Sequence, residues 1–183
     1  MRPKAMTAAM LGALLAALAG CGPQALRIRN GEQVLPADQG SPGFLDRVSS
    51  QPRVSENDAY RGVLMLLDGQ DKDQTFQQRT ENLAARGMVD RSWTHDAARP
   101  LTRGRLAYMI CRACDIRGGV VLHLTGPNPW YCLKELEYQR LMAPGTIFAE
   151  TTGMEFVAVL GRADVLRRTG ELPPIMEVAA GGN

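Results

Sequence analysis

Four residues in the middle of the chain have side chains that could form a metal or thiol site. They follow the spacing C-x2-C-x8-H-x8-C, and three cysteines with one histidine are a known ligand set of structural zinc. A redox-active C-x-x-C pair would instead need its first cysteine at a helix N-terminus, where the thiolate is stabilised. The first cysteine here lies nine positions after the predicted helix start at Thr102, which argues against redox catalysis. The four residues are Cys111, Cys114, His123 and Cys132.

A structural disulfide is the main interpretation of the same cysteines. In an oxidising compartment, Cys132 would bridge to Cys111 or to Cys114 and leave one thiol over. Such a bond would close a loop of about 20 residues and stabilise the fold by roughly 3 kcal/mol. Zinc is the alternative. His123 lies in Val120–Leu124, where an alternating strand pattern would place it on one face whatever its role. The sequence predicts no cofactor.

The helix that carries the C-x-x-C pair begins at Thr102, whose hydroxyl can accept a hydrogen bond from an N–H of the first turn. Its apolar residues recur at i, i+3, i+4 and i+7, the pattern of a helix with one buried face. They are Leu106, Met109, Ile110 and Ala113.

The same helix pattern occurs three times. Aligning Ser55, Thr102 and Thr152, at spacings of 47 and 50 residues, puts apolar residues in the same columns. The first and third starts also have an acid three residues after the cap, as in a capping box. Further helices are predicted over 75–88 and from Asn128-Pro129 onward, but the first copy lacks such a leading helix. The sequence therefore predicts a mostly α fold of repeated helix–loop–helix units, with a short extended segment near 120–124.

The order of helix, twelve-residue loop (89–100) and hydrophobic-Thr-Arg helix start resembles the S-layer homology module. The resemblance covers residues 54–168 and is best at Leu101-Thr102-Arg103-Gly104. It implies a pseudo-threefold bundle that binds a cell-wall polymer, with Thr102 and Arg103 as candidate ligand-binding residues. Glu56 and Gly153 stand where the family has arginine, and Arg105 stands where it has glutamate.

Arg103 has a physical basis for binding an anion. Backbone N–H groups and the dipole at a helix N-terminus favour negative charge, and a guanidinium adds a planar fork for a carboxylate. A carboxylate-bearing saccharide would suit such a site. A solvent-exposed arginine without a ligand is the alternative.

The N-terminus has the features of a processing segment. Arg2 and Lys4 precede the uncharged apolar stretch 6–17, and Leu18-Ala19-Gly20-Cys21 resembles a bacterial lipobox. The resemblance implies cleavage before Cys21 and attachment of fatty-acyl chains, such as palmitate, to that cysteine. Several acyl chains give stable membrane anchoring. Gly22 offers no aspartate retention signal, which favours the outer membrane facing the periplasm.

Composition suggests four segments: a signal peptide (1–20), a flexible tether (21–53), the helical domain (54–168) and a Pro/Gly-rich tail (169–183). Within the tether, Asn30-Gly31 predicts a small hairpin. No second apolar run approaches the roughly 20 residues needed to span a bilayer. Loss of Arg2 and Lys4 lowers the formal net charge from +2 to zero, and no basic patch indicates a nucleic-acid partner.

No residue set predicts enzyme activity. Ser92, His95 and Asp96 are close in sequence, but neighbours along a chain seldom supply triad geometry. Trp93 and Trp130 are either packing residues or a sugar-stacking surface. We therefore expect a non-enzymatic envelope lipoprotein that binds peptidoglycan, another wall polymer or an envelope partner protein. The alternatives are an assembly lipoprotein without glycan binding, and a zinc or thiol protein.

Overall fold

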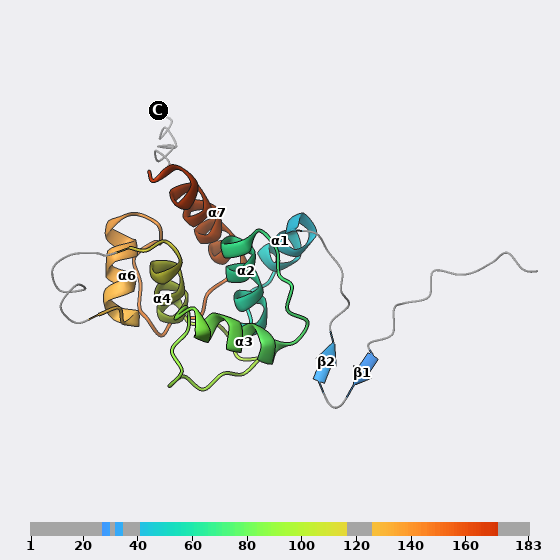
Figure 1. Ribbon diagram of the computed structural model, residues 1–183. Coiled ribbons are helices and arrows are strands. Elements are labelled where there is room, and N and C mark those ends of the chain that lie inside the picture. Colours follow the sequence, from blue (N-terminus) through green and yellow to red (C-terminus); the bar gives the residue numbers. More distant parts are fainter. Residues whose placement is uncertain (1–26, 30–31, 35–40, 117–125, 172–183) are drawn as a thin grey trace, which may run out of the picture. The chain divides into compact units, whose positions relative to one another are not determined.

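Helices make up nearly all of the regular structure in the described part of the chain. The computed structural model describes residues 27–29, 32–34, 41–116 and 126–171. The prediction of a mostly α fold is confirmed. The segment predicted to be extended, 120–124, lies outside the described residues and so does His123. The helices are α1 (Ser41–Ser49), α2 (Glu56–Asp68), α3 (Phe76–Ala85), α4 (Arg103–Ala113), α6 (Pro129–Tyr138) and α7 (Gly153–Thr169) (Figure 1).

The chain divides into two units, Met1–Pro36 and Ala37–Asn183. In the first unit, β1 (Arg27–Arg29) pairs antiparallel with β2 (Glu32–Val34). Arg29 lies opposite Glu32. This register is the one expected for a two-residue turn at Asn30-Gly31, although those two residues lie outside the described part.

Helix α1 corrects the predicted domain boundary. We expected residues 21–53 to be a tether, but Phe44 and Val48 of α1 are completely buried in the core. Their i, i+4 spacing gives α1 an apolar stripe, and α1 packs against α7. Pro42 suggested a linker, yet proline is tolerated in the first turn of a helix, which is where it lies. The helical domain therefore starts before residue 54, and the first copy does have a leading helix.

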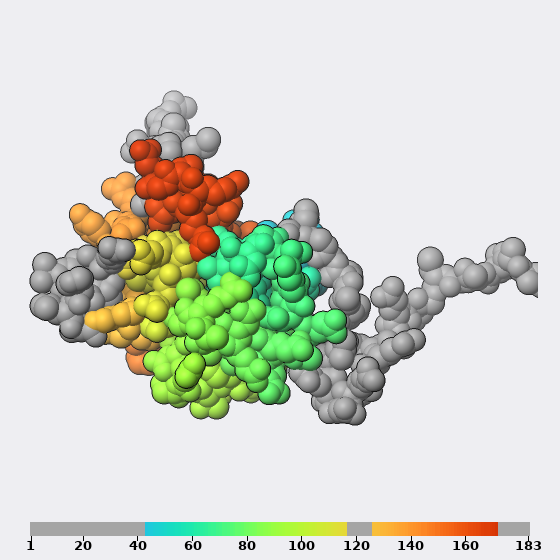
Figure 2. Space-filling view, viewed as in Figure 1, coloured from blue at the N-terminus to red at the C-terminus, as the bar shows by residue number. Residues whose placement is uncertain are grey.

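The helices of the second unit form an inner and an outer set. The inner helices α2, α4 and α7 contact one another. Each outer helix packs mainly on one inner helix: α1 on α7, α3 on α2 and α6 on α4, and α1 also contacts α2 (Figure 1). Figure 2 shows the side chains of α2 and α3 packed together on one face of this unit.

The aligned apolar columns of the sequence are the core-facing positions of the inner helices. Every aligned residue except Leu66 is buried, because the columns follow the stripe that each inner helix turns toward the others. The buried residues are Ala59, Leu106 and Phe156, then Val63, Ile110 and Leu160, then Ala113 and Ala163.

The three segments that lead into the inner helices are joined by a closed ring of backbone hydrogen bonds. The N–H of Val54 donates to the carbonyl of Thr151 (3.0 Å), that of Thr151 to Leu101 (2.8 Å), and that of Leu101 to Val54 (2.8 Å). Each of these residues comes directly before the N-cap of an inner helix. The ring therefore holds the N-termini of α2, α4 and α7 side by side.

Thr151 is the polar member of this ring. Its side chain is completely buried, and its Oγ1 has no hydrogen-bond partner among the described residues. Because valine keeps the shape and removes the unsatisfied hydroxyl, we expect Thr151→Val to raise the free energy of unfolding by about 1 kcal/mol. Urea denaturation measures this. Thr151→Ser, which keeps the hydroxyl and loses the methyl, should lower it. A destabilised Thr151→Val variant would contradict the argument.

Candidate ligand site at the helix N-termini

The two predicted ligand-binding residues lie where α4 begins. Thr102 is the N-cap, and its Oγ1 accepts a hydrogen bond from the N–H of Arg105 (3.4 Å). Arg103 is buried, with only 6% of the residue exposed. Its Nε donates to Glu155 Oε1 (2.8 Å) and its Nη2 donates to the carbonyl of Ala143. The guanidinium of Arg103 is thus already bound within the protein.

The backbone donors of the same helix start are also occupied. The N–H of Arg103 donates to the carbonyl of Ala149 (2.8 Å), and that of Gly104 donates to the carbonyl of Ile147 (3.0 Å). With Thr102 bonded to the third N–H of the turn, the N-terminus of α4 has no free donor for an anion. The donors on which the expected carboxylate site at Thr102 and Arg103 depends are therefore engaged within the protein, and both residues help to hold this helix start in place.

A second ion pair occupies the matching place between the starts of α2 and α4. Glu56 is completely buried, and its carboxylate accepts hydrogen bonds from Arg105 Nη1 and from the N–H of Asp96 (3.0 Å). Arg103–Glu155 and Glu56–Arg105 each join the residue after one N-cap to the third residue after the next N-cap. Acid and base have simply exchanged places. Two departures from the expected motif, at 56 and 105, are therefore one compensated charge reversal.

The third interface, between the third and first copies, uses a different solution. The residue after the N-cap is Gly153, and a Cβ there would lie 1.8 Å from the carbonyl oxygen of Val48. No side chain fits, so Asp58 takes its partners from α1 and the turn after it. Its carboxylate accepts from Arg47 Nη2 (3.1 Å) and from Gln51 Nε2 (3.2 Å).

These ion pairs also explain why the predicted capping boxes are only half formed. Ser55 and Thr152 do accept from the third N–H of their helices. The acids at that position, Asp58 and Glu155, pair with arginines instead of reaching back to the cap. Among the described helices, α3 has the complete box, between Thr75 and Gln78.

Removing the Arg103 side chain should cost stability. Arg103→Ala leaves Glu155 without its cation, so we expect a loss of about 3 kcal/mol in the free energy of unfolding. Urea denaturation of the purified protein measures this loss of stability. The matched control is Arg53→Ala, because Arg53 pairs with Glu150 at 3.3 Å but is 61% exposed. That variant should stay within about 0.5 kcal/mol of the parent chain. Equal effects would refute the structural role of Arg103.

The loop before α4 is held by aromatic contacts. The guanidinium of Arg105 lies 4.8 Å from the centre of the Trp93 ring, and Tyr108 meets that ring edge-on at 5.2 Å. His95 Nδ1 and Tyr60 Oη share a hydrogen bond of 2.7 Å, and burial raises the pKa of Tyr60. Trp93 is therefore a packing residue.

The sequence neighbours of Trp93 do not form a catalytic triad. His95 is bonded to Tyr60, the Asp96 N–H donates to Glu56, and the Ser92 N–H donates to Asp90 Oδ1 (2.8 Å). No contact among the described ones joins Ser92, His95 and Asp96 to one another.

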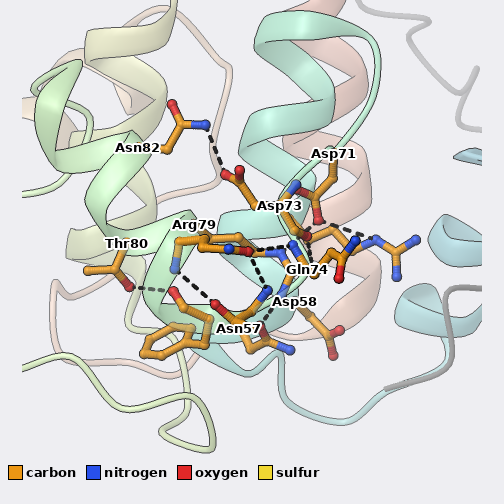
Figure 3. Close-up of polar contacts among 12 residues, drawn as sticks. Asn57, Asp58, Asp71, Asp73, Gln74, Arg79, Thr80 and Asn82 are labelled. Atoms are coloured by element: carbon orange, nitrogen blue, oxygen red, sulfur yellow. Dashed lines mark hydrogen bonds and ion pairs between the residues drawn. The ribbon is translucent and has the colours of Figure 1, made fainter. Parts of the chain in front are cut away.

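A polar network that the sequence did not reveal closes the connection between α2 and α3 (Figure 3). Arg79 is buried and donates to Asp71 Oδ2 (2.7 Å), Asn57 Oδ1 (2.9 Å) and the carbonyl of Asp73 (2.7 Å). Asn82 donates to Asp73 Oδ2 (2.8 Å). The carboxylates of Asp71 and Asp73 thus accept hydrogen bonds from Arg79 and Asn82. Among the described residues, no group of three His, Cys, Asp or Glu side chains could hold a metal ion.

The three candidate cysteines lie in two different surroundings. Cys111 and Cys132 are buried where α4 and α6 pack, and the Cys111 thiol donates to the carbonyl of Ile116 (3.4 Å). The Sγ of Cys114 points to the carbonyl of Ala163 in α7, 3.8 Å away. All three are free thiols in this structure. Two of the four predicted zinc residues are thus brought together, and the third faces another helix.

Large exposed apolar side chains gather in one part of the sequence. Among the described residues they are Trp130 (51% exposed), Tyr138 (84%), Phe148 (81%) and Met154 (74%). All belong to α6, the α6–α7 loop or the first turn of α7. Sequence reasoning named Trp130 but missed the others, which stand outside the aligned apolar columns.

Three of these side chains start close to the N-terminus of α4. A Cβ on Gly104 would lie 2.9 Å from Ile147 Cβ and 3.2 Å from Pro129 Cβ. The backbone of Ile147 and that of Pro129 are therefore both close to Gly104. Phe148 and Trp130 are the next residues along the chain. Met154 precedes Glu155, which binds Arg103 in the same turn. We call Trp130, Phe148 and Met154 the α6–α7 apolar surface.

No family model, curated protein or solved structure matches the chain. In the described part of the chain, no helix is both long and apolar enough to cross a membrane. Cys21 and the preceding segment lie outside the described residues.

Proposed function

We propose that the chain is a non-enzymatic lipoprotein of the cell envelope, and that its helical domain docks onto an envelope partner protein through the α6–α7 apolar surface. Three features support this proposal: the lipobox-like sequence around Cys21, the repeated architecture of the helical domain, and the apolar side chains exposed on one copy of the repeat.

The repeat supports an S-layer-homology-like, pseudo-threefold domain. The closed ring joins equivalent residues Val54, Leu101 and Thr151. The first N–H of each inner helix donates to a loop carbonyl of a neighbouring copy, at Arg99, Ala149 and Gln51. The ion pairs at two interfaces also match in position. A duplicated ancestral unit would produce these three correspondences together.

The observation that carries the docking proposal is the exposure of large apolar side chains on the third copy. Large apolar side chains that are this exposed on a folded domain are candidate anchors for a partner. Phenylalanine, methionine and tryptophan are typical anchors of protein interfaces. The guanidinium that the expected glycan site requires is enclosed at Arg103, which favours a protein partner over a wall polymer.

Crosslinking of the full chain in its native envelope tests the docking proposal. We expect a defined set of partners that is lost in the Trp130→Ala and Phe148→Ala variants and kept in Lys134→Ala, a change of an exposed polar residue on the same helix. An unchanged partner set in all variants would overturn the proposed surface.

A wall polymer remains a second candidate, because a half-exposed Trp130 in edge-to-face contact with Tyr131 (4.9 Å) could stack on a sugar ring. Sedimentation of the purified chain with peptidoglycan sacculi separates the two. Pelleting that depends on Trp130, without a crosslinked protein, would favour the polymer.

The anchor is tested separately. We expect Cys21→Ala to abolish incorporation of labelled palmitate, and the parent chain to fractionate with the outer membrane. Palmitate incorporation that does not depend on Cys21 would reject the lipobox interpretation.

A further inference from the structure

Cys111 and Cys132 face each other across the packed helices α4 and α6. Cys111 lies in the last turn of α4, and Cys132 lies near the start of α6. Both belong to the buried core, with 2% and 0% of the residue exposed, and the two helices that carry them pack against each other. A disulfide needs its two sulfurs to approach to about 2.05 Å with the Cβ atoms about 3.8 Å apart. Two buried cysteines on helices that pack against each other are candidates for such a bond.

The third cysteine lies in different surroundings. The Cys114 thiol lies 3.8 Å from the carbonyl of Ala163 on α7. Burial raises the pKa of Cys114 to about 11, so this thiol keeps its proton at neutral pH. The neighbouring Cys132 thiol lowers the pKa of Cys111, and the Cys111 thiol in turn raises the pKa of Cys132. Of the three, Cys111 is therefore the first to become a nucleophilic thiolate.

We propose that Cys111 and Cys132 are joined by an intramolecular disulfide when the chain meets a disulfide oxidant, and that Cys114 remains a thiol. The sequence alone left Cys111 and Cys114 as equal partners for Cys132. Packing of α4 against α6, and of Cys114 against α7, decides between them.

The oxidant is another disulfide, either a small one such as oxidised glutathione or that of a protein. The Cys111 thiolate attacks one sulfur of the oxidant, forms a mixed disulfide and releases the other sulfur as a thiolate. That thiolate takes the proton of Cys132, whose sulfur then attacks the Cys111 sulfur and displaces the second half of the oxidant as a thiolate. This second thiolate takes up the proton that Cys111 released to solvent. Two protein thiols are oxidised, and one oxidant disulfide is reduced to two thiols.

Burial governs when this exchange occurs. Both sulfurs are closed off from solvent in the folded domain, so the oxidant reaches them during folding or through local opening of α6. Once formed, the bond closes the chain between positions 111 and 132. Closing a loop of this size shifts the folding equilibrium toward the native state on the order of 100-fold.

Thiol counting on the full chain in a glutathione redox buffer, followed by peptide mass mapping, tests the proposal. Under reducing conditions Cys111, Cys114 and Cys132 should all react with maleimide after denaturation. Under oxidising conditions we expect only Cys114 of these three to react, and a linked peptide pair containing Cys111 and Cys132. Cys114→Ser should give the same linked pair and no free thiol among these positions.

A linked pair that contains Cys114 would overturn the assignment, and so would persistence of all three thiols after refolding in oxidised glutathione. Binding of one zinc ion per reduced chain would also overturn the assignment, in favour of a metal site. Because Cys111→Ala or Cys132→Ala could disturb packing of the core, the peptide map of the unmodified chain is the deciding measurement. The unfolding midpoint gives a second one: it should fall on reduction in the parent chain and in Cys114→Ser.

Discussion

Reversing the charge of Glu56 should remove most of the stability of the helical domain, and reversing Arg105 as well should restore much of it. Glu56 is completely buried, and Arg105 supplies its cation. Glu56→Arg places two guanidinium groups together in a low-dielectric interior, so we expect a loss of about 4 kcal/mol in the free energy of unfolding. In Glu56→Arg/Arg105→Glu the pair would have the polarity of the neighbouring Arg103–Glu155 pair.

Restoration should be incomplete for a reason visible in the structure. Arg105 also lies over Trp93, and a glutamate there gives up that cation–π contact, worth about 1 kcal/mol. Denaturation of both single variants and the double variant gives the coupling free energy, which should exceed roughly 2 kcal/mol. The matched control is the same exchange at Arg53 and Glu150, an exposed pair whose coupling should be below about 1 kcal/mol. Independent, additive effects at 56 and 105 would contradict the compensated reversal.

The charge reversal also shows where sequence reasoning reached its limit. The N-caps Ser55, Thr102 and Thr152 were predictable, because local hydrogen bonding fixes them, and the apolar columns followed from helical periodicity. The partner of Glu56 lies 49 residues away, and that of Arg103 lies 52 residues away. Such pairings depend on how three units meet, which no single window of sequence contains.

The same limit explains why the internal partners of Arg103 were not foreseen. An arginine in the first turn of a helix looks available for a ligand, since the dipole disfavours a cation there and nothing nearby in sequence neutralises it. Glu155 and the carbonyl of Ala143 provide that neutralisation from distant positions. The exposed side chains of the α6–α7 apolar surface were missed for the opposite reason. A local pattern shows which residues can form a helix face, but not which face is left without a neighbour.

Helix α1 was missed because its proline and glycine dominated the local composition. Its docking on α7 depends on a close approach at Gly153, where the chain after the N-cap meets the carbonyl of Val48. That contact leaves no room for a methyl group, and the N–H of Gly153 donates to the carbonyl of Gln51 in the same place (3.0 Å). The third interface thus requires a glycine where the other two have Glu56 and Arg103.

Two glycines of α7 should therefore respond in opposite directions to the same substitution. Gly153→Ala drives a Cβ into the backbone of Val48, and we expect a loss of about 3 kcal/mol or more in the free energy of unfolding. Gly161 lies in the middle of α7 with open space around its Cβ position, so Gly161→Ala should gain about 1 kcal/mol from helix propensity. Urea denaturation of the two variants measures both effects.

Limited trypsin digestion distinguishes a local from a global cause. If Gly153 is required for docking of α1, Gly153→Ala should expose Arg47 and Arg53 to cleavage under conditions where the rest of the domain stays intact. Cleavage there should be slow in the parent chain and in Gly161→Ala, because Phe44 and Val48 hold α1 in the core. A Gly153→Ala variant as stable and as protected as the parent chain would show that the close approach at Val48 relaxes, and that α1 depends on its apolar side chains alone.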